Sequence, residues 1–318
     1  MRLYSLSAAA KINLYLEVIG VRPDDYHELV MIMQSVDLAD RVTVRSLATA
    51  EIRLQCDHPQ VPDDHTNLAY RAAMLLQNRF PSAIKQHGGV EITLEKKIPV
   101  GAGLAGGSTN AAAVLIGLDM LWQLGLTQSE LQVLGAELGS DIPFCIAGGT
   151  AIATGRGEQI DSLYGVDNLY AVLAKYQSLS VSTPWAYKTY RQQFSSTYVD
   201  IDVNIGVDRS THQDSIRSGP MVSEIAKQDG QGIAQHLHND LEKVVLPVYP
   251  QVQELKTTLA ACGGLGTLMS GSGPTVFALA ESQTQAEMIA EQLRSHITDT
   301  DLDIWVTRFM PTGIQLIS

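Results

Sequence analysis

The chain has 318 residues and a mass of 34.5 kDa, which is enough for two domains of ordinary size. Apolar residues make up 45% of it and the mean hydropathy is +0.03, values that are typical of a globular protein and that exclude extended disorder. The formal net charge is −12. Binding to long nucleic acid or to an anionic membrane is therefore not expected, because both require a cationic face.

The cysteines and the longest apolar segment indicate the compartment. Cys56, Cys145 and Cys262 are far apart and include no Cys-x-x-Cys pair. Their odd number predicts three buried free thiols in a reducing environment, so we expect a cytoplasmic protein. The longest apolar segment, 111–122, contains Asp119 and is shorter than the ~20 residues of a membrane span, so no such span is expected.

The first half of the chain predicts a mixture of strands and helices. Alternating apolar residues at 12–18 indicate a strand with one buried face, which places Lys11 and Asn13 side by side on its other, exposed face. Further β segments are expected at 42–47, 51–56, 90–94 and up to about 160. The expected helices are 68–80 capped by Asn67, the second half of 99–125 ending at Gly125, and a helix from the capping box at 127–130 to about 139. Asp141 is expected in the turn that follows.

The second half repeats the alternation of strands and helices. Strands are expected at 168–174, 265–269, 275–280 and 303–309, helices from 183 and over 221–241, 247–261 and 283–296, and a polar loop over 200–220. The order strand–turn–strand–helix–strand at the end predicts an α+β unit. We therefore expect two domains, residues 1–162 and 163–318.

A glycine-rich segment at 101–106 matches G-x-G-x-x-G, which is a weak signal alone. A dinucleotide-binding fold requires the strand to run directly into the glycines, but residues 95–99 intervene here. A P-loop requires a lysine after the last glycine, where this chain has Gly107 and Ser108. The other motifs of a protein kinase are absent from the sequence.

The physical properties of this segment favour a phosphate site. Its small residues allow the backbone to approach an anion closely, and Ser108, Thr109 and Asn110 follow at the start of a helix. Free N–H groups and the helix dipole, equivalent to about +0.5 charge, point at a ligand there. A tight turn for close helix packing is the alternative, but it typically needs fewer glycines.

Segment 99–113, PVGAGLAGGSTNAAA, resembles the phosphate loop of the GHMP small-molecule kinases. Further segments resemble the branch of that family that phosphorylates 4-diphosphocytidyl-2-C-methyl-D-erythritol: AAAKINLYL (8–16), RPDDYHEL (22–29), MQSVDLAD (33–40), LGSDIPFCIAGGTA (138–151), NDLE (239–242) and SGSGPTVFAL (270–279). The chain departs from the family pattern at Ala10, Asp25 and Ala105, where the family usually has Pro, Gly and Gly.

The resemblance implies an α+β GHMP kinase fold, with an ATP-binding domain (1–162), a ferredoxin-like domain (163–318) and the active site in the cleft between them. It implies transfer of the ATP γ-phosphoryl group, with Mg²⁺, to the 2-hydroxyl of the cytidyl substrate in the non-mevalonate isoprenoid pathway. A GHMP kinase of the homoserine or mevalonate type is the alternative. A nucleotide-binding dehydrogenase would instead bind NAD without ATP turnover, and the presence of both Lys11 and Asp141 argues against a silent binding protein.

The resemblance also assigns roles to single residues. Asp141 is implied as the base, against the simpler interpretation of a turn aspartate, and Lys11 as the cation that holds its carboxylate, against that of a solvated lysine. Ser108 is the candidate Mg²⁺ ligand. The implied ATP site is Asn67, Lys96, Pro99, Val100, Gly101, Ala102, Gly103, Leu104, Ala105, Gly106, Gly107, Ser108 and Thr109. The implied substrate site is Asn13, Tyr26, His27, Thr183 and Tyr187, with the two tyrosines stacking on the cytosine and His27 reading its edge.

Overall fold

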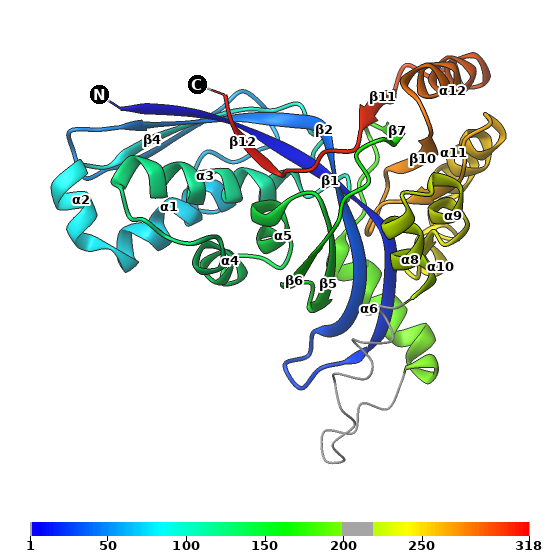
Figure 1. Ribbon diagram of the computed structural model, residues 1–318, viewed down its shortest axis with the longest axis horizontal. Helices are drawn as coiled ribbons and strands as arrows, with labels where there is room; N and C mark the ends of the chain where they lie inside the picture. The colour runs from blue at the N-terminus through cyan, green and yellow to red at the C-terminus, as the bar shows by residue number, and fades with distance from the viewer. Residues whose placement is uncertain (1, 199–218, 318) are drawn as a thin grey trace.

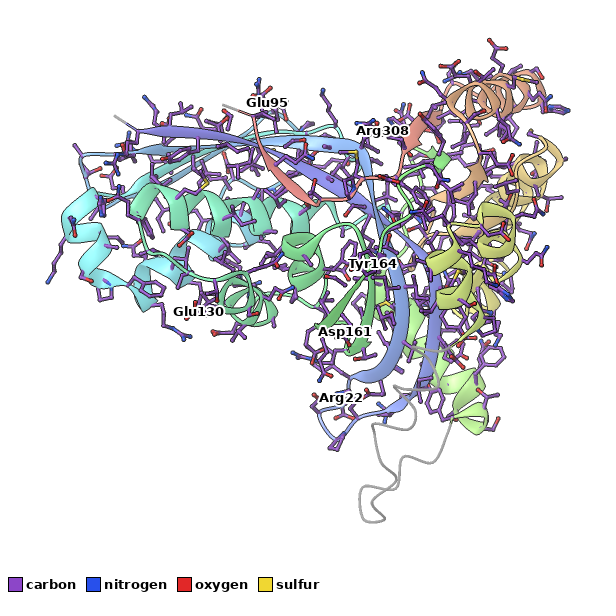
Figure 2. All side chains as sticks on the ribbon, in the orientation of Figure 1. Arg22, Glu95, Glu130, Asp161, Tyr164 and Arg308 are labelled. Carbon is purple, nitrogen blue, oxygen red and sulfur yellow. The ribbon has the colours of Figure 1, made fainter. Side chains whose placement is uncertain are left out.

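A computed structural model describes residues 2–198 and 219–317, so most of the expected loop at 200–220 lies outside the described residues. Within them the chain forms an α+β fold with two β-sheets, which confirms the expected fold class (Figure 1). The two chain ends lie near each other at one end of the first sheet (Figure 1). Glu95 and Glu130 point outward on opposite sides of that sheet and its helices (Figure 2).

The first sheet is built on a long antiparallel hairpin, β1 with β2, and has the order β12-β1-β2-β4-β3, with β5 on β2, β6 on β5 and β8 on β1. The helices between these strands lie on one side of the sheet (Figure 1). The strands are β1 Leu3–Val21, β2 His27–Ser46, β3 Ile52–Cys56, β4 Val90–Glu95, β5 Thr150–Gly155, β6 Gln159–Leu163, β8 His238–Asn239 and β12 Ile314–Leu316. The helices are α1 Leu68–Arg79, α2 Pro81–His87, α3 Gly106–Trp122, α4 Gln128–Ala136 and α5 Ile142–Ala147.

The second sheet is antiparallel with the order β11-β7-β10-β9. Its strands are β7 Tyr170–Tyr176, β9 Thr267–Met269, β10 Val276–Ala280 and β11 Leu302–Arg308. Its helical segments are α6 Thr183–Phe194, η1 Ser195–Thr197, α8 Pro220–Lys227, α9 Gly230–Gln235, α10 Glu242–Val245, α11 Pro250–Ala261 and α12 Gln283–His296. The succession β-α-β-β-α-β is that of a ferredoxin-like unit.

Strands from the second half of the chain join the first sheet, across the expected domain boundary at 162/163. β6 ends at Leu163 and β7 begins at Tyr170, but β8 and β12 return from the second half of the chain to pair with β1. The division into 1–162 and 163–318 therefore stays a prediction, with two short strands that cross back over it.

Strand β1 changes its buried face twice, and this change positions the site. Leu6 and Ala8 belong to the core under the helices, whereas Ile12 and Leu14 belong to a second core against the other sheet. The pairing with β2 shifts register between Ala9 and Ala10 and again between Asn13 and Tyr15. Each shift moves alternate side chains to the opposite face, as β-bulges do. Between the shifts, residues 11 and 13 occupy the face that apolar residues occupy elsewhere.

Local signals in the sequence agree with the observed starts of α1 and α4, whereas the helix expected over 221–241 was wrong beyond Gln235, because residues 238–239 form strand β8. The Asn67 side chain accepts a hydrogen bond from the Ala69 N–H, and the Thr127 capping box is complete. The long helix ends before Gly125, at Trp122, with Gln123 in the left-handed region at φ 56°. None of the described helices has the length and apolarity that crossing a membrane requires. Cys56 is only partly buried, so the expectation of three buried thiols was wrong for that residue.

Candidate active site

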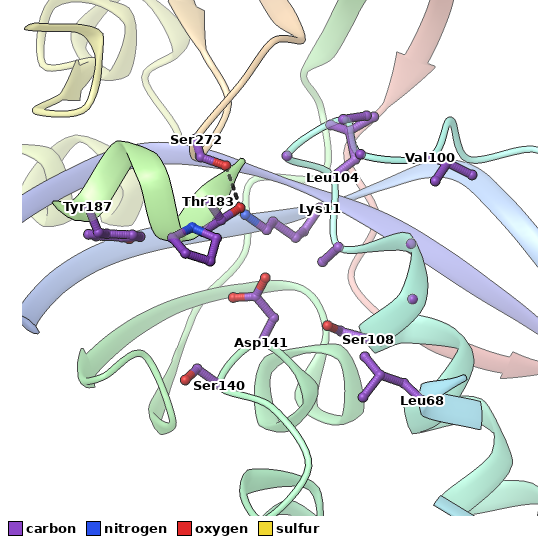
Figure 3. A pocket seen from close by; sticks show the side chains of 18 of the residues that line it. Lys11, Leu68, Val100, Leu104, Ser108, Ser140, Asp141, Thr183, Tyr187 and Ser272 are labelled. Atoms are coloured by element: carbon purple, nitrogen blue, oxygen red, sulfur yellow. Dashed lines mark hydrogen bonds between the residues drawn. The ribbon is translucent and has the colours of Figure 1, made fainter. Parts of the chain in front are cut away.

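A pocket of about 910 Å³ lies between the glycine-rich loop, strand β1, the start of α6 and the turn after β9. Every residue expected in the site lines it except Thr109, which is fully buried within α3. The structure thus brings together segments that are separated by up to 261 positions of the chain, from Lys11 to Ser272. Figure 3 shows Lys11, Asp141, Thr183 and Ser272 directed into the same space.

The glycine-rich loop is held from two sides. The Lys11 N–H donates to the Leu104 carbonyl oxygen at 3.1 Å, and the Ser270 hydroxyl donates to the Gly103 carbonyl oxygen at 3.1 Å. Helix α3 begins directly after the loop, and no side chain of the described residues caps it, which leaves its first N–H groups for an anion. This arrangement is what a phosphate-binding loop requires.

The two departures from glycine in the family pattern occur at residues with left-handed backbone. Ala105, the N-cap of α3, has φ 58°, and Asp25, at the β1–β2 turn, has φ 64°. Glycine adopts this region without cost, whereas another L-residue pays about 1–2 kcal/mol. The left-handed backbone is therefore the physical reason for a glycine at both positions in the family, although this chain has other residues there.

Lys96 lies in the pocket wall, but its ammonium group already forms an ion pair with a carboxylate of the protein. Its ammonium contacts the Asp40 carboxylate and donates to the Asn110 side-chain oxygen at 2.9 Å, and both side chains of the ion pair are at least 96% buried. Asp40 also accepts from the N–H groups of Lys97 and Ile98 at 2.7 and 2.8 Å. This cluster fixes the chain before the glycine-rich loop to the start of α3. Direct contact of Lys96 with ATP stays a prediction.

Lys11 and Asn13 are buried, so the expectation of an exposed strand face was wrong. Their exposed fractions are 5% and 0%, and the Lys11 ammonium donates to the Asn13 side-chain oxygen at 2.5 Å. The register shifts in β1 are the reason, because they turn both residues toward the helices. No ion pair between Lys11 and Asp141 occurs in the described residues. The space between them is part of the pocket (Figure 3).

Asp141 lies in the expected turn, where it is the N-cap of a short helix, α5, which the sequence analysis missed. The residue is helical at φ −80° and ψ −15°, and its side chain does not cap the helix. Its carboxylate points into the pocket (Figure 3). Burial and the nearby charge of Asp141 together raise the pKa of Tyr187, so that phenol stays neutral. A proline in the first turn is the signal that could have revealed this helix.

The other end of the pocket is aromatic. The rings of His27 and Tyr187 lie in contact, with centroids 5.2 Å apart and planes inclined by 31°. Tyr26 is 54% exposed, and the Arg156 guanidinium lies 4.9 Å from the centroid of its ring. Burial, together with the charge of Arg191, lowers the pKa of His27, so its imidazole is neutral near pH 7. The His27 Nε2 atom is buried without a hydrogen-bond partner in the described part of the chain, so contact of this atom with the cytosine edge stays a prediction.

Several lining residues were missed by the sequence analysis. Arg156, Lys188 and Arg191 bring cationic groups to the aromatic end, and the Ser272 hydroxyl lies 2.7 Å from that of Thr183. The serine belongs to segment 270–279, which the sequence analysis named as part of the resemblance without assigning it a role. No motif of the sequence analysis pointed to these three cations, because only the fold brings them together at the aromatic end of the pocket.

Comparisons with known proteins agree with this geometry. The family model of the GHMP kinases N terminal domain matches residues 67–149, and that of the GHMP kinases C terminal matches residues 221–299. The 4-diphosphocytidyl-2-C-methyl-D-erythritol kinase of Gloeothece citriformis is 60% identical over 99% of both chains. The chain belongs to the GHMP kinase family. Another relative of this GHMP kinase, from Nostoc punctiforme and with the same name, is 61% identical over 100% of this chain and 99% of its own.

Solved structures have the same fold as this GHMP kinase. A crystal structure of 4-(cytidine 5'-diphospho)-2C-methyl-D-erythritol kinase is 32% identical, with a TM-score of 0.72 over 96% of this chain and 98% of that chain. A homoserine kinase from Cytophaga hutchinsonii has a TM-score of 0.74 at 20% identity, over 100% of this chain and 98% of that chain, which shows a shared fold.

Proposed function

We propose that this GHMP kinase transfers the γ-phosphoryl group of ATP to the 2-hydroxyl of 4-diphosphocytidyl-2-C-methyl-D-erythritol. Relatives that are 53–61% identical over nearly their whole length carry the name of that kinase. The supporting observation in the structure is one continuous pocket with the free start of α3 at one end and the His27–Tyr187 pair at the other. Its free cysteines are in keeping with a reaction in the reducing cytoplasm.

Asp141 and Lys11 lie between these two ends and are suited to the chemical step. The substrate hydroxyl oxygen attacks the γ-phosphorus, the bond to the bridging oxygen of ADP breaks, and the hydroxyl proton passes to the Asp141 carboxylate. Lys11 is placed by its hydrogen bond to Asn13 and carries a positive charge toward the transferring group. A fixed cation in a pocket shielded from water stabilises the charge of the transition state without reorganisation.

The start of α3 also suits a magnesium ion. The Ser108 hydroxyl lines the pocket beside the expected phosphates, and the Asp141 carboxylate faces the same space. Within the described residues no group of three or more His, Cys, Asp or Glu side chains is positioned to hold a metal. Mg²⁺ matches such a sparse oxygen set because it keeps several waters and binds substrate phosphates. Ser108 would hold the ion, which would neutralise phosphate charge when bound.

Release of ADP in the presence of a panel of alcohols tests the proposal. The cytidyl substrate is expected to be turned over, and its uridyl analogue, homoserine and mevalonate are expected to be poor substrates. A site that pairs with one polar base edge rejects the other, because its own buried groups are left unpaired. Turnover of homoserine or mevalonate in preference to the cytidyl substrate would move the assignment to another GHMP kinase.

Replacement of the base tests the mechanism within the same assay. Asp141→Asn keeps the size of the side chain and is expected to lower kcat by at least ~10²-fold, since general bases contribute about 10²–10⁴-fold. Affinity for a non-hydrolysable ATP analogue should change little. Near-normal turnover in this variant would remove Asp141 from the role of base.

A further inference from the structure

The turn at residues 270–273, between β9 and β10, contacts three parts of the active site at once. The Ser270 hydroxyl donates to the carbonyl oxygen of Gly103 in the glycine-rich loop at 3.1 Å. The same hydroxyl accepts from the Asn13 N–H on β1 at 3.4 Å. The Ser272 and Thr183 hydroxyls lie 2.7 Å apart, which connects the turn to α6. A displacement of the turn would therefore disturb the glycine-rich loop, strand β1 and helix α6 together.

The turn also lies directly against the proposed cation. A Cβ atom built on Gly271 would be 3.4 Å from the Lys11 ammonium and 3.3 Å from the Asn13 side-chain oxygen. The backbone at Gly271 thus forms the wall against which Lys11 and Asn13 are placed. Movement of this wall toward or away from β1 would change the position of the Lys11 charge.

The Asn239 side chain holds the turn in place from outside the pocket. Its amide nitrogen donates to the carbonyl oxygens of Met269 at 2.7 Å and Gly271 at 2.8 Å, and its oxygen accepts from the Leu241 N–H at 2.9 Å. Asn239 is 4% exposed and does not line the pocket. Both amide protons and the oxygen are therefore used in holding backbone.

Asn239 is itself tied to the strand that carries Lys11. It belongs to β8, which pairs in parallel with β1, and Leu16 is its partner in the register. The neighbouring Asp240 carboxylate accepts from the Val18 N–H of β1 at 2.9 Å. The side-chain amide of Asn239 thus sets the position of the 270–273 turn relative to β1.

We infer that Asn239 is a positioning residue for phosphoryl transfer, which acts by holding the 270–273 turn against Lys11 and the glycine-rich loop. The inference rests on the proposed function for its kinetic test. Reactions of this kind are sensitive to placement, because a displacement near 1 Å can cost ~10²-fold in rate. Asn239 does not line the pocket, so its effect is expected in kcat more than in the KM values.

Two substitutions separate the donor function of the amide from its bulk. Asn239→Leu is similar in size but leaves the two carbonyl oxygens without a donor. Asn239→Asp places a carboxylate against the same oxygens, a contact that is repulsive when the group is ionised. When it is protonated, the introduced carboxyl donates one hydrogen bond and restores part of the contact. Burial beside carbonyl oxygens disfavours the ionised form of this carboxyl group, so a lower pH is expected to favour the form that donates.

The experiment measures kcat and both KM values for the two variants and the wild type between about pH 6 and pH 8, together with thermal unfolding. The expected result at pH 8 is a loss of about 10- to 100-fold in kcat for both variants, with KM values within about threefold. The activity of Asn239→Asp relative to wild type should then rise as the pH falls, whereas that of Asn239→Leu should not. Asn78→Asp, the same change at an exposed position, is the matched control and should follow the wild type.

Hydrogen exchange gives a second measurement that needs no substrate. The N–H groups of Ser270 and Gly273 are bonded within the turn to the carbonyl oxygens of Thr275 and Ser270 at 2.9 Å each. Faster exchange in the peptide that covers 269–275 is expected in both Asn239 variants. This result would show that Asn239 holds the 270–273 turn even if the wild type did not accept the cytidyl substrate. Failure of the proposed function would therefore be seen separately.

Three results would overturn the inference. The first is a kcat within about twofold of wild type in both variants, a difference too small for a displaced catalytic group. The second is a flat ratio of Asn239→Asp to wild type across the pH range. The third is unfolding of both variants at the assay temperature, because Asn239 would then be required for the fold and not for placement of the turn.

Discussion

Gly107, the second residue of α3, offers a direct test of whether ATP phosphates lie on the start of this helix. Among the residues that the structure describes, a Cβ atom at this position would have the Leu68 Cδ1 atom at 3.7 Å, which is an ordinary contact. Alanine is favoured over glycine in a helix by up to ~1 kcal/mol. Gly107→Ala is therefore expected to be as stable as the wild type without nucleotide, or slightly more stable.

The same methyl group would project where a phosphate has to approach the backbone. Gly107 lines the pocket and is exposed to it. Overpacking by one methyl group costs about 1–3 kcal/mol, and 1.4 kcal/mol corresponds to a tenfold change in Kd. Gly107→Ala is therefore expected to weaken ATP binding by about tenfold or more while its free energy of unfolding does not fall.

Gly103→Ala provides the contrast, because its cost arises within the protein. Gly103 has φ 73°, and a Cβ atom there would lie 2.3 Å from the Ser270 carbonyl oxygen and 3.1 Å from that of Gly273. The left-handed backbone alone costs an alanine about 1–2 kcal/mol, and the contact with backbone cannot be relieved by a rotamer change. Stability and ATP binding should fall together in this variant.

The assay pairs calorimetric binding of a non-hydrolysable ATP analogue with urea unfolding in the absence of nucleotide. The decisive comparison is between the two variants. An unchanged Kd in Gly107→Ala would show that the phosphates do not approach the start of α3. A Gly103→Ala variant as stable as wild type would show that the loop tolerates side chains where the geometry forbids them.

Three further predictions concern other parts of the molecule. Asp40→Asn should lower the free energy of unfolding by about 3–5 kcal/mol, because it leaves the buried Lys96 ammonium without its partner, and a loss under about 1 kcal/mol in urea unfolding would contradict this. Burial opposes ionisation of Asp240, but hydrogen bonds from two side chains and the Val18 N–H outweigh it and lower its pKa. Its contribution is therefore complete above the unfolded pKa of ~3.9 and is lost as the pH falls below it, so urea unfolding should show the stability difference between wild type and Asp240→Asn narrowing below about pH 4. Tyr187→Ala should raise KM for the cytidyl substrate by about tenfold, since stacking on a base is worth ~1–3 kcal/mol, with ATP affinity unchanged; an unchanged KM would argue against stacking.

The sequence alone predicted those features that depend on short stretches of chain. The Asn67 cap and the Thr127 capping box set helix starts through contacts over two or three residues. The glycine-rich segment predicted a loop that precedes a helix, because the density of glycines and the apolar residues that follow are both visible in a short stretch of sequence. Motifs were enough to gather most of the candidate site, since the family resemblance supplied the residues that the fold then placed in one pocket.

The tertiary structure decided what depends on register and on contacts between distant segments. Alternation along β1 predicted an exposed Lys11, but two shifts in its pairing with β2 bury that residue on the pocket side. A shift of register leaves no mark in a period-2 pattern of one strand, because it depends on the partner. The ion pair between Asp40 and Lys96 joins residues that are 56 positions apart in the chain. The hydrogen bond from Asn239 to the Gly271 carbonyl oxygen joins residues that are 32 positions apart. Such contacts form because burial of a polar group requires a partner, and packing of the two sheets determines which group is within reach.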